Sequence, residues 1–173
     1  MKTTVLIAFL SFAFLTSYSQ PADTPSVPKI GFGLDLGLPF TEGYGSLIGG
    51  LVRLEYPIKS DLSATASLGY SRLSYDKELR DLLEAFGESG SDGVVPIKVG
   101  LKKYLSSPLY LQGELGLAIN DGTAFILSPR IGYEKPLKKG SIGASIRYEL
   151  WTNDGSMHFV SLGLEYNLPL GGK

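Results

Sequence analysis

The stretch SIGASIRYEL WTNDGSMH FVSLGLEYNL, residues 141–168, determines how the rest of the chain is interpreted. In its first arm, the apolar residues from Ile142 to Leu150 alternate with polar or small ones. Alternation over ten residues is typical of a β-strand with one apolar and one polar face. Residues 153–156 supply turn chemistry, and the alternation resumes from Val160 to Leu168. The stretch therefore predicts a hairpin of two long strands.

The length and the polar face of this hairpin favour a barrel in a membrane. Ten residues at about 3.3 Å each, tilted by about 40°, rise about 25 Å, which matches the apolar band of a transmembrane barrel. A water-soluble sandwich rarely needs strands of this length. Arg147, Glu149 and Glu165 lie among glycines and serines on the polar face, as expected where that face encloses a narrow lumen.

The composition limits the class of protein without indicating a chemistry. The 173 residues allow one domain, and the 22 glycines suit a strongly curved sheet. The near balance of 16 basic and 17 acidic residues predicts no nucleic-acid partner. The absence of cysteine excludes a disulfide framework, a thiolate metal site and a lipoprotein anchor. No phosphate loop, metal-spaced carboxylate set or nucleotide fingerprint is present, so we expect no cofactor.

The amino-terminal segment predicts export. Lys2 gives a positive start, and residues 5–15 form an apolar core that is too short to span a bilayer. Small residues end this segment, so we expect a signal peptide over residues 1–19 with cleavage after Ser19. Residues 20–28 contain three prolines and few apolar side chains, which predicts an unstructured tether.

Alternating segments then fill residues 29–170. The expected strands are residues 29–38, 46–58, 62–75, 94–105, 109–119, 123–134, 141–150 and 159–168. An even number of antiparallel strands joined to nearest neighbours closes into a barrel without exposed edges. We therefore predict an all-β fold, an eight-stranded antiparallel up-and-down transmembrane β-barrel. Two features are less regular: Leu47 and Leu51 fall on the polar parity, and Pro96 indicates an early strand position or a bulge.

The connections between these strands alternate in length, which predicts an orientation. Those after the second, fourth and sixth strands are tight, as expected on the periplasmic side, whereas the long loop 76–93 would face outward. Within it, Asp76 can cap a short helix that Gly87 ends. Its apolar residues recur on one helix face: Leu79, Leu82, Leu83 and Phe86. This face predicts a lid on the barrel mouth, a segment laid in the outer leaflet, or a loop that binds a surface partner.

Aromatic residues give an independent indication of a membrane. On the apolar parity they gather near the periplasmic ends of the strands (Tyr56, Tyr133 and Tyr166) and near the outer ends (Phe40, Tyr70, Phe125 and Tyr148). Two girdles are expected where amphipathic rings meet the head-group layers. The alternative is a soluble ligand-binding barrel, which would reverse the pattern and keep its apolar face inside.

The opposite parity places ionised side chains in the lumen. The predicted set is Asp35, Arg53, Glu55, Lys98, Lys102, Glu114, Arg130, Arg147, Glu149 and Glu165. Side chains about fill the interior of an eight-stranded barrel, so these charges must pair or remain uncompensated at a cost of several kcal/mol each. We expect a structural ladder of salt bridges that blocks flow. A proton or small-ion relay would need a continuous file of water.

One constellation leaves an enzyme open as an alternative. His158, the only histidine, lies near Ser156 and Asp154 in the last outer turn, where a lipid-modifying rim enzyme would hold a base and a nucleophile. His158 shares the outward parity of Val160, and residues this close to a turn need not form a relay. We therefore expect no catalysis.

Three segments resemble one bacterial family. Residues 147–156 (RYELWTNDGS), 96–104 (PIKVGLKKY) and 110–116 (YLQGELG) are similar to strands of the small outer membrane β-barrel, or porin-family, proteins of Gram-negative bacteria. The likeness spans residues 29–168 and brings no catalytic signature. It implies an eight-stranded outer-membrane barrel without a family active site to carry over. We expect a monomer in contact with outer-membrane lipid, located in the cell outer membrane, with a structural or surface-interaction role.

Overall fold

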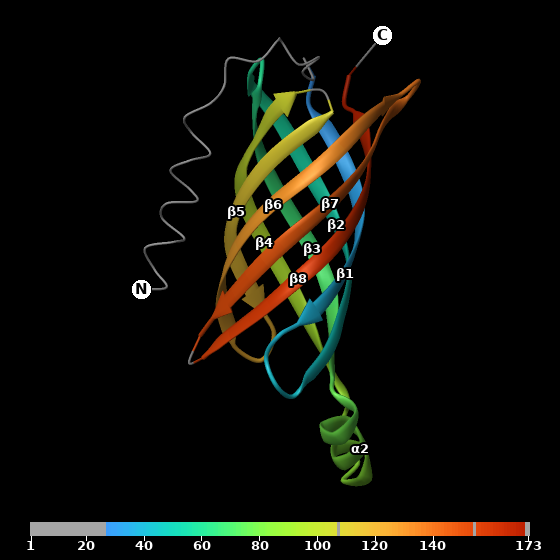
Figure 1. Ribbon diagram of the computed structural model, residues 1–173, viewed down its shortest axis with the longest axis vertical. Helices are drawn as coiled ribbons and strands as arrows, with labels where there is room; N and C mark the ends of the chain where they lie inside the picture. The colour runs from blue at the N-terminus through green and yellow to red at the C-terminus, as the bar shows by residue number, and fades with distance from the viewer. Residues whose placement is uncertain (1–26, 107, 154, 172–173) are drawn as a thin grey trace.

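Eight antiparallel strands form one sheet that closes on itself between β1 and β8 (Figure 1). The computed structural model describes residues 27–106, 108–153 and 155–171. The strands are β1 (Lys29–Pro39), β2 (Tyr44–Lys59), β3 (Leu62–Tyr75), β4 (Ser91–Ser106), β5 (Leu109–Ile119), β6 (Thr123–Leu137), β7 (Gly140–Thr152) and β8 (Ser156–Pro169). The prediction of an eight-stranded, antiparallel up-and-down barrel is confirmed. The expected signal peptide and residues 20–26 of the expected tether lie outside the described residues.

Alternation along each strand separates the two faces of the wall. In β1, Leu34 is 66% exposed and Asp35 is 6% exposed, although they are neighbours in the chain. Successive side chains of a strand point to opposite faces, so a period of two in polarity becomes an apolar outside and a polar inside. All seven aromatic residues expected in the two girdles are exposed on the outside. Within the described residues, no helix is long and apolar enough to cross a membrane.

The two ends of the barrel differ in their connections. We call the end where β1 begins and β8 finishes the turn end, because β2–β3, β4–β5 and β6–β7 are joined there tightly (Figure 1). The opposite end is the loop end. The long loop there is shorter than residues 76–93, because Arg72, Leu73 and Ser74 of β3 pair with residues 91–93 and extend β4. Pairing thus continues past the point where the apolar alternation stops.

Pro96 lies inside β4 without a bulge. The ladder between β3 and β4 pairs Leu68 with Ile97 and Ser71 with Val94, in a single unshifted register. The pairs between them are missing, as expected for a residue without a backbone N–H. The alternative of a bulge is therefore wrong. The sheet keeps its register and lacks only the β3–β4 pairs next to Pro96.

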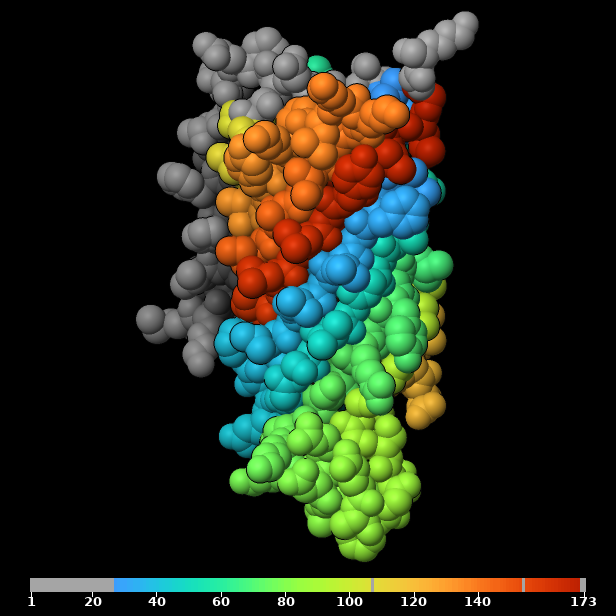
Figure 2. Space-filling model, turned by 90° about the vertical axis from the view of Figure 1, so that its right-hand side faces the viewer, coloured from blue at the N-terminus to red at the C-terminus, as the bar shows by residue number. Residues whose placement is uncertain are grey.

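The long loop carries one helix, α2 (Lys77–Ala85), beyond the loop end (Figure 1). Asp76 Oδ1 accepts a hydrogen bond from Leu79 N at 2.9 Å, and Gly87 takes φ +78° after the last turn. The expected helix and cap are therefore present. Figure 2 shows the segment as a lobe that projects from the end of the barrel. No residue of α2 is buried, and Leu82 and Phe86 are exposed, so the expectation of a lid on the mouth is wrong.

The interior near the loop end is apolar, which departs from the expectation of a polar lumen throughout. We call this cluster the apolar plug: Leu47, Leu73, Val94, Ala118, Ile126, Trp151 and Phe159. Trp151 meets Phe159 edge to face, with ring centroids 4.7 Å apart. The inward parity of seven strands, β2 to β8, turns apolar here, and side chains from opposite walls of a narrow barrel then meet and exclude water.

Candidate functional site

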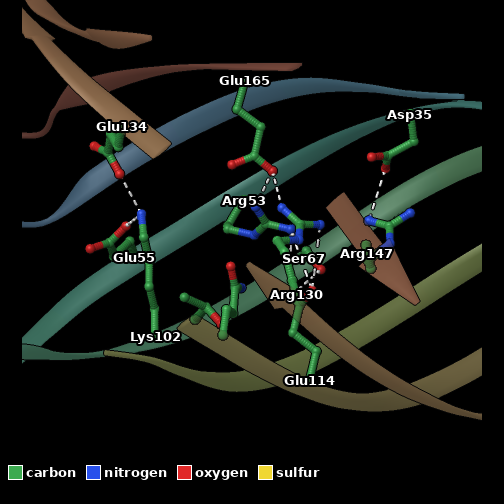
Figure 3. A network of polar contacts seen from close by, with 12 residues as sticks. Asp35, Arg53, Glu55, Ser67, Lys102, Glu114, Arg130, Glu134, Arg147 and Glu165 are labelled. Carbon is green, nitrogen blue, oxygen red and sulfur yellow. Dashed lines mark hydrogen bonds and ion pairs between the residues drawn. The ribbon is translucent and has the colours of Figure 1, made fainter. Parts of the chain in front are cut away.

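The barrel interior holds ion pairs in three clusters, most of whose residues are labelled in Figure 3. All ten residues predicted for the lumen are buried, and seven of the eight strands contribute them. The remaining strand, β3, contributes the inward-facing hydroxyl groups of Ser67 and Thr65. Each charged side chain is on the inward parity of its strand, so the alternation described above places it there.

The central cluster joins four strands across the lumen. Arg53 of β2 and Arg130 of β6 lie between the carboxylates of Glu114 and Glu165 (Figure 3). Arg130 Nη1 is 2.6 Å from Glu165 Oε1, and Arg53 Nη1 pairs with the same oxygen. The contacts to Glu114 are longer, 3.5 Å from Arg53 and 3.7 Å from Arg130. Ser67 Oγ donates to Glu114 at 3.2 Å. Two cations and two anions thus compensate one another.

The turn-end cluster is centred on one ammonium group. Lys102 Nζ lies 2.8 Å from Glu55 Oε2 and also pairs with Glu134. Its charge lies over two rings, 4.8 Å from the Tyr104 centroid and 4.3 Å from that of Tyr110. Tyr104 OH donates to Glu55 at 2.7 Å.

Glycine makes room for one of these rings. Gly132 is the cross-strand partner of Tyr110, and a Cβ at that position would overlap the ring.

The third cluster connects the charges to the apolar plug. Lys98 Nζ is 2.7 Å from Glu149 Oε1, and Arg147 Nη1 is 3.1 Å from Asp35 Oδ2. Trp151, a member of the plug, donates its indole N–H to Glu149 Oε2 at 2.9 Å. A cavity of about 10 Å³ lies beside this cluster, which is about enough space for one water molecule.

Three inward residues were missed by the sequence analysis. Glu134 accepts from Lys29 at 2.6 Å and from Ser141 at 2.5 Å, and Tyr104 reaches the same cluster. Parity alone could have found them, because Glu134 continues the series of Arg130 and Gly132. They lie near strand ends, where alternation does not decide whether a side chain enters the lumen or reaches solvent. With Lys29 and Glu134 included, six acids face six bases.

The candidate catalytic residues do not form a relay. His158 faces outward, and its Nδ1 lies 2.6 Å from the Tyr148 hydroxyl. Ser156 is exposed at the start of β8, and Asp154 lies outside the described residues. Among the residues that the structure describes, no group of three or more His, Cys, Asp or Glu side chains could hold a metal ion.

Solved structures of two bacterial barrels are similar to this chain. One is the Yersinia pestis outer membrane protein Ail in a phospholipid bilayer nanodisc, with 14% identity and a TM-score of 0.52 over 81% of this chain and 99% of that one. The other is the N-terminal β-barrel domain of Pseudomonas aeruginosa OprF, with 15% identity and a TM-score of 0.50 over 86% and 100%. At these identities, the likeness shows the fold. No protein-family model matches the sequence, and no curated protein matches it either.

The central cluster generates a prediction about stability. Replacing Arg130 by Met removes one cation that faces Glu114 and Glu165, and leaves buried carboxylate charge without compensation. We expect the free energy of unfolding to fall by about 3–5 kcal/mol, measured by urea titration in detergent micelles. The control is Arg80→Met, whose exposed partner Glu84 is 3.9 Å away, with an expected loss below about 1 kcal/mol. Equal losses for the two variants would contradict the role of the cluster.

Proposed function

We propose that this protein is a small barrel of the bacterial outer membrane, with a lumen closed by its own side chains and a structural or surface-interaction role without catalysis. The observation that carries the proposal is the outward face of the wall. Between the ionisable residues near its two ends, such as Lys103 and Lys135 at one end and Arg72 and His158 at the other, every outward side chain is apolar, glycine or tyrosine.

The dimensions of this face support a membrane. A strand segment of about ten residues, tilted by about 40° from the barrel axis, gives a band about 25 Å tall. The exposed leucine, isoleucine and valine side chains of this face, at 36–66% exposure, would be unfavourable in water over so large an area, and they are favourable in lipid. The aromatic residues at both ends of the band suit the two head-group layers. The similar fold of two outer membrane barrels is consistent with this location.

The same observation argues against the soluble ligand-binding barrel. A soluble calyx keeps an apolar cavity inside and polar side chains outside. Here the charged side chains point into the lumen, while Leu34, Leu36 and Leu164 point outward at 57–66% exposure. In a soluble protein, the apolar outer face of the sheet would therefore be exposed to water.

The charge clusters support a structural role for the lumen. Each cluster joins strands that are distant in the sequence, as in the pair Arg53–Glu165, whose members are 112 residues apart. A slip of one residue in any of the seven strands that carry lumen charges would turn those side chains toward the lipid, at a cost of several kcal/mol for each. The clusters therefore favour one register.

Two barriers support a lumen that does not conduct. The central cluster spans the interior, and the apolar plug closes it toward the loop end, where Leu47, Ile126 and Phe159 are 0–2% exposed. A conducting path would need a continuous file of water past both. A relay of protons or small ions is therefore disfavoured.

Helix α2 is the part of the chain best placed for a surface interaction. Hydrogen bonds anchor the segment where it leaves the barrel: Asp76 N donates to Gly43 O at 3.0 Å, and the Tyr75 hydroxyl donates to Asp92 at 2.5 Å. Leu82 and Phe86 are 55% and 79% exposed on its apolar face. An ordered helix that exposes two large apolar residues can offer a partner both shape and apolar contact.

The first prediction from this proposal concerns membrane insertion. Leu34 lies in the middle of β1 and faces outward, so a lysine there would be placed near the bilayer midplane. We expect Leu34→Lys to lower the stability of the inserted barrel by about 2–4 kcal/mol and to reduce the fraction of heat-modifiable protein on gels of membrane fractions. Leu82→Lys in α2 is the control and should not change this fraction. Wild-type protein that is monodisperse without detergent would contradict the proposal.

The second prediction concerns conduction. In planar lipid bilayers, the inserted wild-type barrel should give no steady conductance of the nanosiemens class. The variant Leu47→Ala/Trp151→Ala removes much of the plug and leaves the central cluster in place, so it should also remain closed. A steady open level in the wild type would show that water passes both barriers.

The third prediction separates α2 from the barrel. Replacing residues 76–90 by a short Gly-Ser turn should leave the free energy of unfolding of the barrel unchanged within about 0.5 kcal/mol, because no residue of α2 is buried. Urea titration in micelles measures this quantity. The same variant should lose binding to any surface partner that the parent protein captures. A large loss of barrel stability would instead give the loop a structural role.

A further inference from the structure

Opposite charges are separated onto the two ends of the barrel. At the turn end, the outward and turn positions carry Lys59, Lys103, Lys135, Lys138 and Lys139, against one acid, Asp61. At the loop end, the described residues carry eight acids (Glu42, Asp76, Glu78, Asp81, Glu84, Glu88, Asp92 and Asp121) against Arg72, Lys77 and Arg80. The lumen is balanced and the whole chain has a formal net charge of −1, so composition gives no sign of this separation.

We call the five lysines of the turn end the basic collar, because they follow the rim from β2 to β7. Leu62 pairs with both Lys59 and Lys103, which places these two lysines about 10 Å apart on alternate strands. Ile142 pairs with Lys135, and the turn between β6 and β7 contains Lys138 and Lys139. All five lie at the turn end of the wall, in or next to the turns β2–β3, β4–β5 and β6–β7.

Most of the collar is not engaged within the protein. Lys103 lies 3.9 Å from Asp61, in a pair whose side chains are both about one-third to one-half exposed. The other four lysines are exposed, and within residues 27–106, 108–153 and 155–171 they form no ion pair. Four ammonium groups on one rim repel one another, so an anionic ligand there would relieve that repulsion.

Tyrosines define the level of the collar relative to the wall. Tyr56, Tyr133 and Tyr166 lie on the outward face just inside the lysines. Tyr133 is two residues from Lys135 on the same face, and the Tyr166 hydroxyl donates to Lys139 O at 3.3 Å. Tyrosine rings prefer the boundary between acyl chains and head groups, and flexible lysines extend from there toward phosphate.

We propose that the basic collar binds the phosphate groups of anionic phospholipids in the leaflet at the turn end. The inference rests on the proposed membrane location and adds the class of lipid and the leaflet. Electrostatic attraction at an anionic surface strengthens binding by about fivefold per lysine and weakens with salt. The acidic loop end would be repelled by the same lipids, so the charge separation also favours one orientation of the barrel.

The test compares lipids around the inserted barrel. Wild-type protein is folded into vesicles of phosphatidylcholine mixed with phosphatidylglycerol, and spin-labelled forms of the two lipids report the relative association of each with the protein. We expect a preference for phosphatidylglycerol of about fivefold at low salt. Raising the ionic strength should remove this preference without releasing the protein from the bilayer.

Matched variants then locate the preference. Lys59→Gln/Lys135→Gln/Lys138→Gln/Lys139→Gln should lose it while keeping heat-modifiable migration, because these side chains are exposed. The control Lys77→Gln/Arg80→Gln at the loop end should keep it. Equal association of the two lipids with inserted wild-type protein, or a preference that survives in the collar variant, would overturn the collar and leave the proposed function standing. Failure of wild-type protein to insert into any vesicle would overturn both.

Discussion

Charges enclosed in a narrow barrel must neutralise one another, and the architecture of this protein depends on that constraint. No bulk water reaches Glu114, which is 1% exposed, so its ionised form persists only beside Arg53 and Arg130. The guanidinium groups come from β2 and β6, and the carboxylates of the cluster from β5 and β8. These charges can therefore neutralise one another only when four strands that are distant in the sequence are correctly aligned in the closed sheet. The ion pairs thus depend on closure of the whole barrel.

The interior and the ends solve different physical problems. The interior is electrically balanced, because each charge there is paired or remains at a high desolvation cost. The ends are unbalanced, because exposed charge there is solvated at little cost. Between the central cluster and the acidic loop end lies the apolar plug, which Trp151 joins to the charges through its hydrogen bond to Glu149. The barrel thus changes from charged to apolar inside before it reaches the loop end.

The alternation along each strand predicted most of the residues of the candidate site, but none of the ion pairs between them. The alternation in β2 places Arg53 and Glu55 on one face, and every strand repeats this logic, so sequence spacing is enough to decide inside from outside. Spacing carries no information on which residue of another strand lies opposite at the same height. Glu134 was missed for a related reason. Near the end of a strand, alternation shows which face of the sheet a side chain is on, but not whether it lies inside the lumen or beyond its end.

The sequence by itself determined the class of fold, the number of strands, the two faces of the wall and the capped helix in the long loop. These depend on periodicity and on local turn chemistry, which neighbouring residues specify. Only the tertiary structure decided that Arg53 and Arg130 share Glu165, that Leu47 joins Phe159 in a plug, and that α2 stands clear of the mouth. Those outcomes depend on the stagger of eight tilted strands around a closed ring, which brings together residues that no local pattern relates.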